Sequence, residues 1–151
     1  MGTTSKNEFT AIRSLSKRTL TNIMHTQNVL AENFNEILKC FDLSSEQFNV
    51  LKILEDQKGK PTNMCEIQER MISKTSNTTR LVDKLLLKGY VTREVCSKNR
   101  RKVDVFITKS GMEILRDLKP GMDVYEEKLS HKLTLKEFEN LNFLLEKYRT
   151  A

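Results

Sequence analysis

The sequence predicts a fold that is mainly α-helical and carries one small β-hairpin. Apolar residues recur at spacings of three and four through most of the chain, as they do in amphipathic helices. Capping motifs mark where several of these helices begin. Between Tyr90 and Thr108 the apolar pattern changes to the alternation that is typical of β-strands. One hairpin is therefore expected between two groups of helices.

The composition favours one soluble domain over residues 1–151, because a chain of this length fits a single hydrophobic core. No apolar run is long enough to cross a membrane and no secretory leader is recognisable, so we expect a cytoplasmic protein without a membrane partner. The three cysteines are widely spaced and form no Cys-x-x-Cys pair. They are therefore expected to be reduced thiols.

Positive charge is concentrated in the middle of the chain. The net charge is +6, yet the segment from Lys58 to Lys102 holds twelve Lys or Arg against four Asp or Glu, which is +8. The remainder is therefore at −2. A local basic block of this kind is typical of a phosphate-binding surface, although a merely solvated face would have the same composition.

The first predicted helix runs from Phe9 to Phe41. A helix of that length rises on the order of 45 Å, more than a small monomer can cover. One end is therefore expected to pack against a second copy of the chain. Residues 7–41 and 109–150 are the predicted helical dimerisation regions.

Two further helices are expected before the hairpin, after a well-marked capping box. Ser44-Ser45-Glu46-Gln47 begins a helix that ends at the Gly and Pro of residues 57–61. Asn63, three residues before Glu66, can cap a short helix that carries Met64, Ile67 and Met71. Ser73 or Thr75 can then cap another, which buries Leu81, Leu85 and Leu86.

The hairpin is predicted from residues 90–96 and 102–108, with a basic tip at residues 97–101. Gly89 marks the end of the helix that precedes it. After the hairpin, Thr108 can cap a helix that Pro120-Gly121 either kinks or splits, with a second segment running to Lys132. Thr134 and Glu137 form the capping box of a last helix.

Two short helices, a tight turn and a basic hairpin together predict a winged helix-turn-helix over residues 44–108. The second helix has the dimensions to enter a DNA major groove, while the hairpin reaches the neighbouring backbone or minor groove. Residues 73–80 hold no large apolar side chain. Arg80 could pair with guanine, Asn77 could read adenine, and Thr79 could contact a phosphate or a thymine methyl group. The predicted DNA-binding residues are Ser73, Lys74, Thr75, Ser76, Asn77, Thr79, Arg80, Lys84, Lys98, Asn99, Arg100, Arg101 and Lys102.

The run of residues 79–85, the Lys-Gly-Tyr-Val of residues 88–91 and the Ile-Thr-Lys-Ser-Gly of residues 107–111 together resemble the MarR family of bacterial transcription regulators. The order of helices and hairpin is similar over nearly the whole chain. The resemblance implies a homodimer in which the first, fifth and sixth helices interlock. It also implies binding to a roughly palindromic operator of double-stranded DNA, repression of transcription, and release by a small-molecule effector or an oxidant.

The tip of the hairpin departs from the family pattern. An Asp often stands two residues before a wing Arg in the family, whereas this chain has Asn99 before Arg100 and Arg101. An amide can still bind a guanidinium, but without the charge-assisted component of the hydrogen bond. We expect the cations of the tip to compensate through phosphate contacts.

Cys65 is the candidate for oxidant sensing, because the first turn of a helix stabilises a thiolate. Packing is the alternative for Cys65 and the expectation for Cys40 and Cys96. His25 and His131 have no metal-ligand spacing, so neither a metal nor a cofactor is expected.

The sequence contains no phosphate loop, nucleophile elbow or paired acid and base, which argues against an enzyme. The alternative function is a winged-helix protein-interaction module, which should expose apolar anchors on its second helix. An RNA-binding module should supply aromatic stacking platforms, and residues 73–102 offer only Tyr90.

Overall fold

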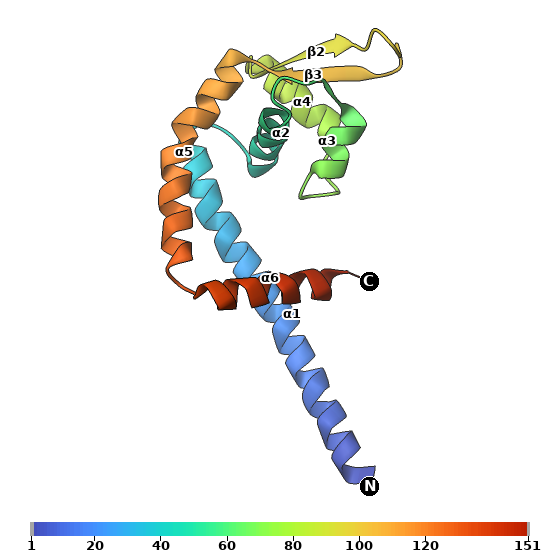
Figure 1. Cartoon of the computed structure of the whole chain (residues 1–151), viewed down its shortest axis with the longest axis vertical. Coiled ribbons are helices and arrows are strands. Elements are labelled where there is room, and N and C mark those ends of the chain that lie inside the picture. Colours follow the sequence, from blue (N-terminus) through green and yellow to red (C-terminus); the bar gives the residue numbers. More distant parts are fainter. Residues whose placement is uncertain (1, 151) are drawn as a thin grey trace. The chain divides into compact units, whose positions relative to one another are not determined.

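The computed structural model describes residues 2–150 and is mainly helical (Figure 1). The chain forms two compact units, Met1–Ser45 and Glu46–Ala151. The elements follow one another as α1 (Gly2–Lys39), α2 (Ser45–Asp56), β1 (Thr62–Asn63), α3 (Met64–Arg70), α4 (Thr78–Leu87), β2 (Val91–Val95), β3 (Val103–Ile107), α5 (Lys109–Ser130) and α6 (Leu135–Arg149). The prediction of a mainly α fold with one hairpin is confirmed.

The first unit consists of the long helix α1 and the turn that follows it. α1 begins at Gly2, seven residues earlier than the apolar pattern predicted, and ends at Lys39 instead of Phe41. The early start is understandable because adding residues to an existing helix costs little, and residues 2–8 contain no proline. Large apolar side chains remain exposed along α1: Phe9, Ile12, Leu15, Leu20, Met24, Val29 and Leu30.

The second unit contains the core around the winged motif. α2 begins at Ser45, next to the Ser44 of the predicted capping box. Its end is followed by a tight turn, in which Lys58 has φ of 53° and Gly59 has φ of 82°. The fully buried large side chains of this unit are Leu51, Ile67, Met71, Leu85, Leu118, Val50, Val82 and Val105. Val82 was missed by the sequence analysis, which expected Leu81 and Leu86 beside Leu85.

The predicted hairpin is the β2–β3 pair, and it belongs to a three-stranded antiparallel sheet of order β1-β3-β2. Val91 pairs with Ile107 at one end and Val95 with Val103 at the other. The sequence analysis missed β1, whose Thr62 pairs with Val105. Two residues are too short a strand for an alternating pattern to reveal. Thr62 and Val105 are both fully buried, so β1 closes the inner edge of the sheet.

The starts of the two short helices were predicted with different success. Asn63 caps α3 as expected: its side chain accepts a hydrogen bond from the Glu66 N–H at 3.0 Å, and the Glu66 carboxylate accepts from the Asn63 N–H at 3.0 Å. The expectation that Ser73 or Thr75 caps the next helix is wrong, because α4 begins at Thr78 with Asn77 as its cap. Asn and Ser are nearly equal as caps, so composition alone does not select between them.

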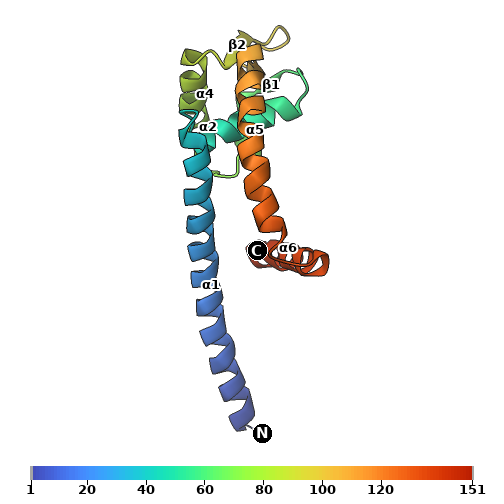
Figure 2. The ribbon, with the colours of Figure 1, turned by 90° about the vertical axis from the view of Figure 1, so that its left-hand side faces the viewer.

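The terminal helices begin where the capping residues predicted. The Thr108 hydroxyl accepts from the Gly111 N–H at 3.1 Å, and Thr134 with Glu137 forms the capping box of α6. α5 continues through Pro120 to Ser130, so the proline does not split the helix (Figure 2). The second segment that was expected to reach Lys132 is therefore part of α5. No helix in the described part of the chain combines the length and apolar composition needed to cross a bilayer.

Candidate nucleic-acid interface

Helix α4 has one buried face and one exposed face. Thr78, Val82 and Leu85 are buried. The exposed residues fall at spacings of one, three and four, which places them on one side of the helix: Thr79, Arg80, Asp83, Lys84 and Leu87. Three of the predicted DNA-binding residues, Thr79, Arg80 and Lys84, therefore share the solvent face of α4.

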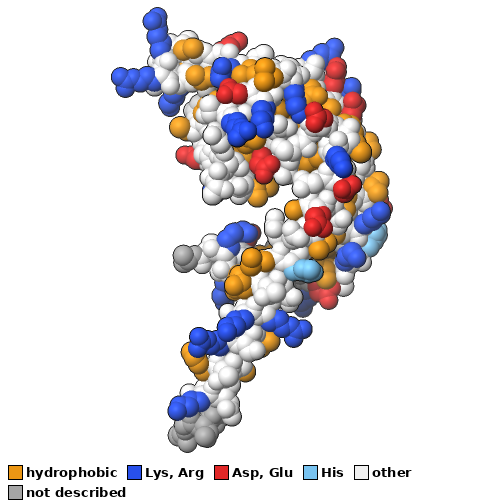
Figure 3. Space-filling model, turned by 180° about the vertical axis from the view of Figure 1, so that it is seen from behind, with side chains coloured by type: hydrophobic (Ala, Val, Ile, Leu, Met, Phe, Trp, Pro, Cys, Tyr) orange, Lys and Arg blue, Asp and Glu red, His pale blue; other side chains and the backbone are white. Residues whose placement is uncertain are grey.

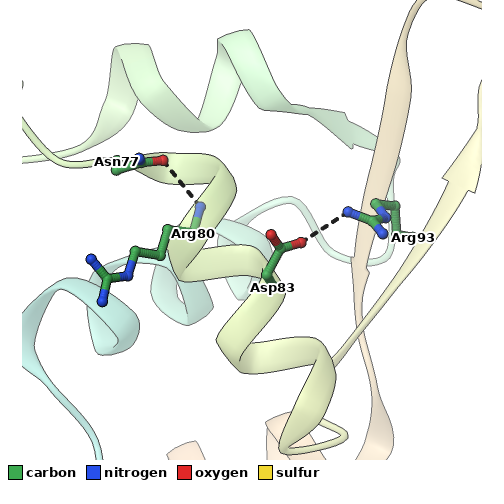
Figure 4. A network of polar contacts seen from close by, with 4 residues as sticks. All are labelled: Asn77, Arg80, Asp83 and Arg93. Carbon is green, nitrogen blue, oxygen red and sulfur yellow. Dashed lines mark hydrogen bonds and ion pairs between the residues drawn. The ribbon is translucent and has the colours of Figure 1, made fainter.

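Asn77 lies at the start of this helix and is engaged with it. Its Oδ1 accepts a hydrogen bond from the backbone N–H of Arg80 at 3.1 Å (Figure 4). A bidentate contact with adenine would use the same oxygen together with the amide NH₂ group. Because a carbonyl oxygen has two lone pairs, such a contact would require Oδ1 to accept two hydrogen bonds at once.

The remaining predicted residues of this segment, residues 73–76, lie in the loop before α4 and not in the helix. Ser73, Lys74 and Thr75 are exposed and Ser76 is half-buried. The Lys74 ammonium donates to the backbone carbonyl of Glu69, near the end of α3. Cations are favourable at a helix C-terminus, so Lys74 also stabilises the end of α3.

Two amides that the sequence analysis did not single out hold this loop in place. The Asn49 side chain in α2 accepts from the Ile72 N–H at 2.9 Å. The Gln68 NH₂ group in α3 donates to the Lys74 carbonyl at 2.9 Å, and the Gln68 oxygen accepts from the buried Thr78 hydroxyl. The Asn49–Ile72 contact spans 23 positions and the Gln68–Thr78 contact spans ten. Contacts between residues so far apart leave no local pattern in a sequence, which is why they were missed.

The hairpin tip presents the second group of predicted residues. Its backbone is closed by the Cys96 N–H donating to the Lys102 carbonyl at 2.9 Å and by the Lys102 N–H donating to the Asn99 carbonyl at 2.9 Å. Lys98, Arg100, Arg101 and Lys102 are exposed. Figure 3 shows blue Lys and Arg side chains projecting from the hairpin end of the molecule.

Asn99 has a different partner from the one expected. Its Oδ1 accepts from the backbone N–H of Arg101 at 3.1 Å, so this oxygen binds the main chain and not a guanidinium. A side chain of Asn or Asp that binds the backbone two residues ahead forms an Asx-turn. Asn99 thus shapes the tip of the hairpin.

An ion pair connects the solvent face of α4 to the hairpin. The Arg93 Nη1 in β2 lies 3.0 Å from the Asp83 Oδ1 in α4 (Figure 4). Neither residue was predicted as part of the site. Because the two lie ten positions apart on different elements, sequence spacing could not reveal the pair.

Two large apolar side chains lie exposed next to these polar groups. Leu87, on the solvent face of α4, is 89% exposed, and Ile72, in the loop before α4, is 87% exposed. The sequence analysis expected hydroxyls, an amide and cations there instead of apolar anchors. An exposed leucine can contact a thymine methyl group or a partner protein.

The thiols and histidines do not form a second site. Cys40 and Cys65 are exposed and Cys96 is half-buried, so the expectation that Cys40 is packed as a small apolar side chain is wrong. Cys40 has little to pack against because it follows the end of α1, and its thiol donates to the Glu36 carbonyl at 3.9 Å. The described residues hold no group of three His, Cys, Asp or Glu that could bind a metal.

The comparisons with known proteins give one consistent result. The model of the MarR family matches residues 43–103, which is the winged motif. Among solved structures, a MarR transcription factor from Planctomyces limnophilus is 30% identical, with a TM-score of 0.65 over 86% of this chain and 94% of that one. No curated protein sequence matches this chain.

Two further structures are similar over the same extent. A MarR-like transcription regulator from Bacillus cereus is 25% identical, with a TM-score of 0.77 over 89% of this chain and 95% of that chain. A mutant MarR from E. coli, solved in complex with operator DNA, is 27% identical, with a TM-score of 0.74 over 87% of this chain and 94% of that one.

Fold and interface together define a DNA-binding protein of the winged helix-turn-helix class. Two short helices meet at a turn, the second presents polar and basic side chains, and a basic hairpin follows. The chain belongs to the MarR family, whose members are transcription regulators and not enzymes.

Proposed function

We propose that this chain represses transcription by binding a roughly palindromic operator as a homodimer. The observation that carries the proposal is the solvent face of α4. It presents Thr79, Arg80 and Lys84, while the same compact unit exposes four cations at the hairpin tip. The region of residues 44–108 is the proposed DNA-binding part, with residues 7–41 and 109–150 serving dimerisation.

In the proposed complex, α4 enters the major groove and the wing, defined as β2, β3 and residues 96–102, lies along the neighbouring backbone or minor groove. Arg80 is suited to a bidentate contact with guanine and Thr79 to a phosphate or a thymine methyl group. The exposed cations of the wing would neutralise phosphates and release counterions, which makes the affinity dependent on salt. Base selectivity then comes from α4, and much of the affinity comes from the wing.

Dimerisation is supported by the apolar side chains that both units leave exposed. In α6, Leu135, Phe143 and Tyr148 are 77%, 62% and 51% exposed, and none of the described residues of this helix is buried. α1 leaves a similar row exposed. Rows of exposed apolar side chains along a helix are typical of an interaction site, and a second copy is the partner that a palindromic operator requires.

Release of the DNA by a small-molecule effector or an oxidant is the regulatory part of the proposal. Cys65, exposed in the first turn of α3, is the candidate thiol for an oxidant. Cys65 lies at the start of α3 and the loop of residues 73–76 follows its end, so an adduct would act on the proposed DNA surface through α3, which packs against α4. A cytoplasmic location fits all of these roles.

The test is selection of bound sites from a random pool of duplex DNA, followed by a salt titration on the best site. Recovery of an inverted repeat with half-sites about one turn apart, on the order of 10 bp, is the expected result. Binding without sequence preference but with the same salt dependence would contradict the proposal. The protein-interaction module, for which the exposed Leu87 would be the anchor, would then be the better hypothesis.

A further inference from the structure

Asp83 is an unexpected residue for a surface that binds DNA. It is the only acidic residue within α4 and lies on the solvent face between Arg80 and Lys84. Its carboxylate points toward β2, whereas the Arg80 side chain extends away from it on the same exposed side of α4 (Figure 4). Taken alone, its charge would repel the DNA backbone and weaken binding.

The partner of Asp83 explains how the carboxylate is accommodated. Arg93 is the middle residue of β2, and alternate residues of a strand point to the same side, so Arg93 shares a side with the buried Val91. That side faces the interior, and α4 packs against β2. From this position the Arg93 guanidinium reaches Asp83 with an N–O distance of 3.0 Å.

The location of the pair relative to the connection between α4 and β2 is the important point. The two elements are joined by a short turn in which Gly89 has φ of 75°. A single connection leaves the angle between a helix and a strand to be fixed by packing. Backbone and hydroxyl hydrogen bonds hold the turn itself: the Tyr90 N–H donates to the Leu85 carbonyl at 3.0 Å and the Thr108 hydroxyl to the Gly89 carbonyl at 2.7 Å. The Asp83–Arg93 contact is a further connection between side chains, formed four residues before the end of α4 and two residues into β2.

Beyond Arg93 the hairpin is no longer covered. Val95, the next residue on the same side, is 64% exposed, and the tip from Ser97 to Lys102 is exposed throughout. Arg93 is therefore the last residue of β2 that is tied to α4 by a side chain with a known partner.

A small change of angle at the turn is enlarged at the tip of the wing. The extended part of the chain beyond Gly89 reaches Cys96, seven residues or about 23 Å away, so a rotation of about 10° would displace the start of the tip by roughly 4 Å. Successive phosphates of one DNA strand are spaced about 3.4 Å along the helix axis. Such a displacement is therefore enough to move the tip from one phosphate to another.

We propose that the Asp83–Arg93 ion pair is a positioning device, which fixes the angle between α4 and the wing so that both contact one DNA segment in register. The proposal rests on DNA binding as the function. Both side chains are about half exposed, 43% for Arg93 and 53% for Asp83, so the pair contributes little to the stability of the fold. Its proposed role is to fix the angle between α4 and the wing.

The proposal predicts an effect opposite in sign to simple electrostatics. Asp83→Asn removes a negative charge from the DNA surface, so an electrostatic role alone would tighten binding and steepen its salt dependence. A positioning role predicts that Asp83→Asn weakens binding to the selected site by about tenfold. The double variant Asp83→Asn/Arg93→Gln keeps the net charge of the original chain and is expected to show the same loss.

A matched control is available in α5. Asp123 forms an exposed ion pair with Lys119 at 2.6 Å, outside α4 and the wing. Asp123→Asn makes the same change of charge and breaks an ion pair of the same kind. Because Asp123 lies in the region proposed for dimerisation, this control is compared with the original chain at a concentration at which sedimentation shows both to be dimers, and there it is expected to bind DNA equally well. Arg93→Lys, which keeps the cation, is expected to retain part of the affinity.

The angle itself is measured without DNA. Spin labels at Thr79→Cys and Ser97→Cys, with Cys40, Cys65 and Cys96 replaced by serine and labelled chains diluted in unlabelled ones, report the distance from α4 to the wing. The distribution is expected to broaden in Asp83→Asn and to stay unchanged in Asp123→Asn.

Each outcome bears on a different statement. Unchanged distances in Asp83→Asn, or tighter binding by that variant, would overturn the positioning role. Failure of the original chain to select any site would instead contradict the proposed function, while the distance measurement would still decide whether the pair fixes the wing.

Discussion

Arg80 and Arg101 represent the two kinds of contact that a DNA-binding surface makes. Arg80 lies on the solvent face of α4, where it can reach base edges, and Arg101 lies at the exposed tip of the wing. A base contact specifies sequence, whereas a phosphate contact adds affinity without selectivity.

Arg80→Ala is therefore expected to cost about 1–3 kcal/mol of binding free energy and to relax the preference at one base position. Arg101→Ala should weaken binding to all sequences about equally. It should also reduce the slope of the logarithm of the binding constant against the logarithm of salt concentration by about one unit per site. Competitive binding to a library of single-base operator variants, repeated at several salt concentrations, checks both. Equal losses of selectivity in the two variants would contradict this division of roles.

Gly111 lies where α5 begins against the base of the wing. A Cβ atom at this position would lie 2.3 Å from the Tyr90 carbonyl oxygen and 2.7 Å from the Ile107 side chain. Gly111→Ala is expected to destabilise the fold by about 1–3 kcal/mol, because the backbone of Tyr90 must move. Chemical denaturation gives the value.

The control for this substitution lies in the same helix. Gly121 is exposed within α5, so Gly121→Ala should be neutral or stabilise by up to about 1 kcal/mol through helix propensity. A similar loss of stability in both variants would show that the close approach at Gly111 is not the cause.

At the scale of elements, the start of α4 is set by Asn77. Asn77→Ala should destabilise the fold by about 1 kcal/mol, because the Arg80 N–H loses the side-chain oxygen that caps the helix. Ser73→Ala should have a much smaller effect, since Ser73 precedes the helix and its hydroxyl contacts only the Thr75 hydroxyl among the described interactions. Thermal unfolding of both variants checks the order, and a larger loss for Ser73→Ala would contradict the boundary at Thr78.

The sequence predicted the elements whose signals are local. The cap at Asn63, the capping box at Thr134 and the hairpin alternation each involve neighbouring residues, and all three are confirmed. The cap of α4 was missed because Ser73, Thr75 and Asn77 are all good caps within five residues of one another.

The contacts that complete the site could not be predicted for a different reason. Gln68, Asn49 and the Asp83–Arg93 pair act through partners on other elements, which only the folded chain brings together. The residue types of the proposed interface were recognisable from the sequence. The way in which α4 and the wing are held was not.

At the scale of the whole molecule, the exposed apolar surface predicts self-association. α6 has no buried residue among those described, and contact with a second copy of the chain would cover its exposed apolar side chains. Unfolding of the chain should therefore shift to higher temperature as the protein concentration rises. Sedimentation at micromolar concentration is expected to give a dimer.

A variant separates the role of this surface from that of the winged motif. Phe143→Glu places a charge at a site that is 62% exposed in the single chain, so it should leave the fold intact but shift the protein toward the monomer. Binding to an inverted repeat should then weaken much more than binding to a half-site. A dimer that survives Phe143→Glu and also the corresponding Leu135→Glu would exclude α6 from the interface.

The junction at Thr108 has a consequence for how the length of the chain can vary. One hydroxyl group donates to the Gly89 carbonyl at 2.7 Å and accepts from the Gly111 N–H at 3.1 Å, and the Thr108 N–H donates to the Tyr90 carbonyl at 3.0 Å. An insertion or deletion directly before Thr108 would displace all three bonds at once, and one between Thr108 and Gly111 would break the cap of α5. At the exposed tip, residues 97–101, a change of length would alter the proposed phosphate contacts but leave the junction and the core in place. Natural variation in length should therefore concentrate at the tip and be absent at the junction.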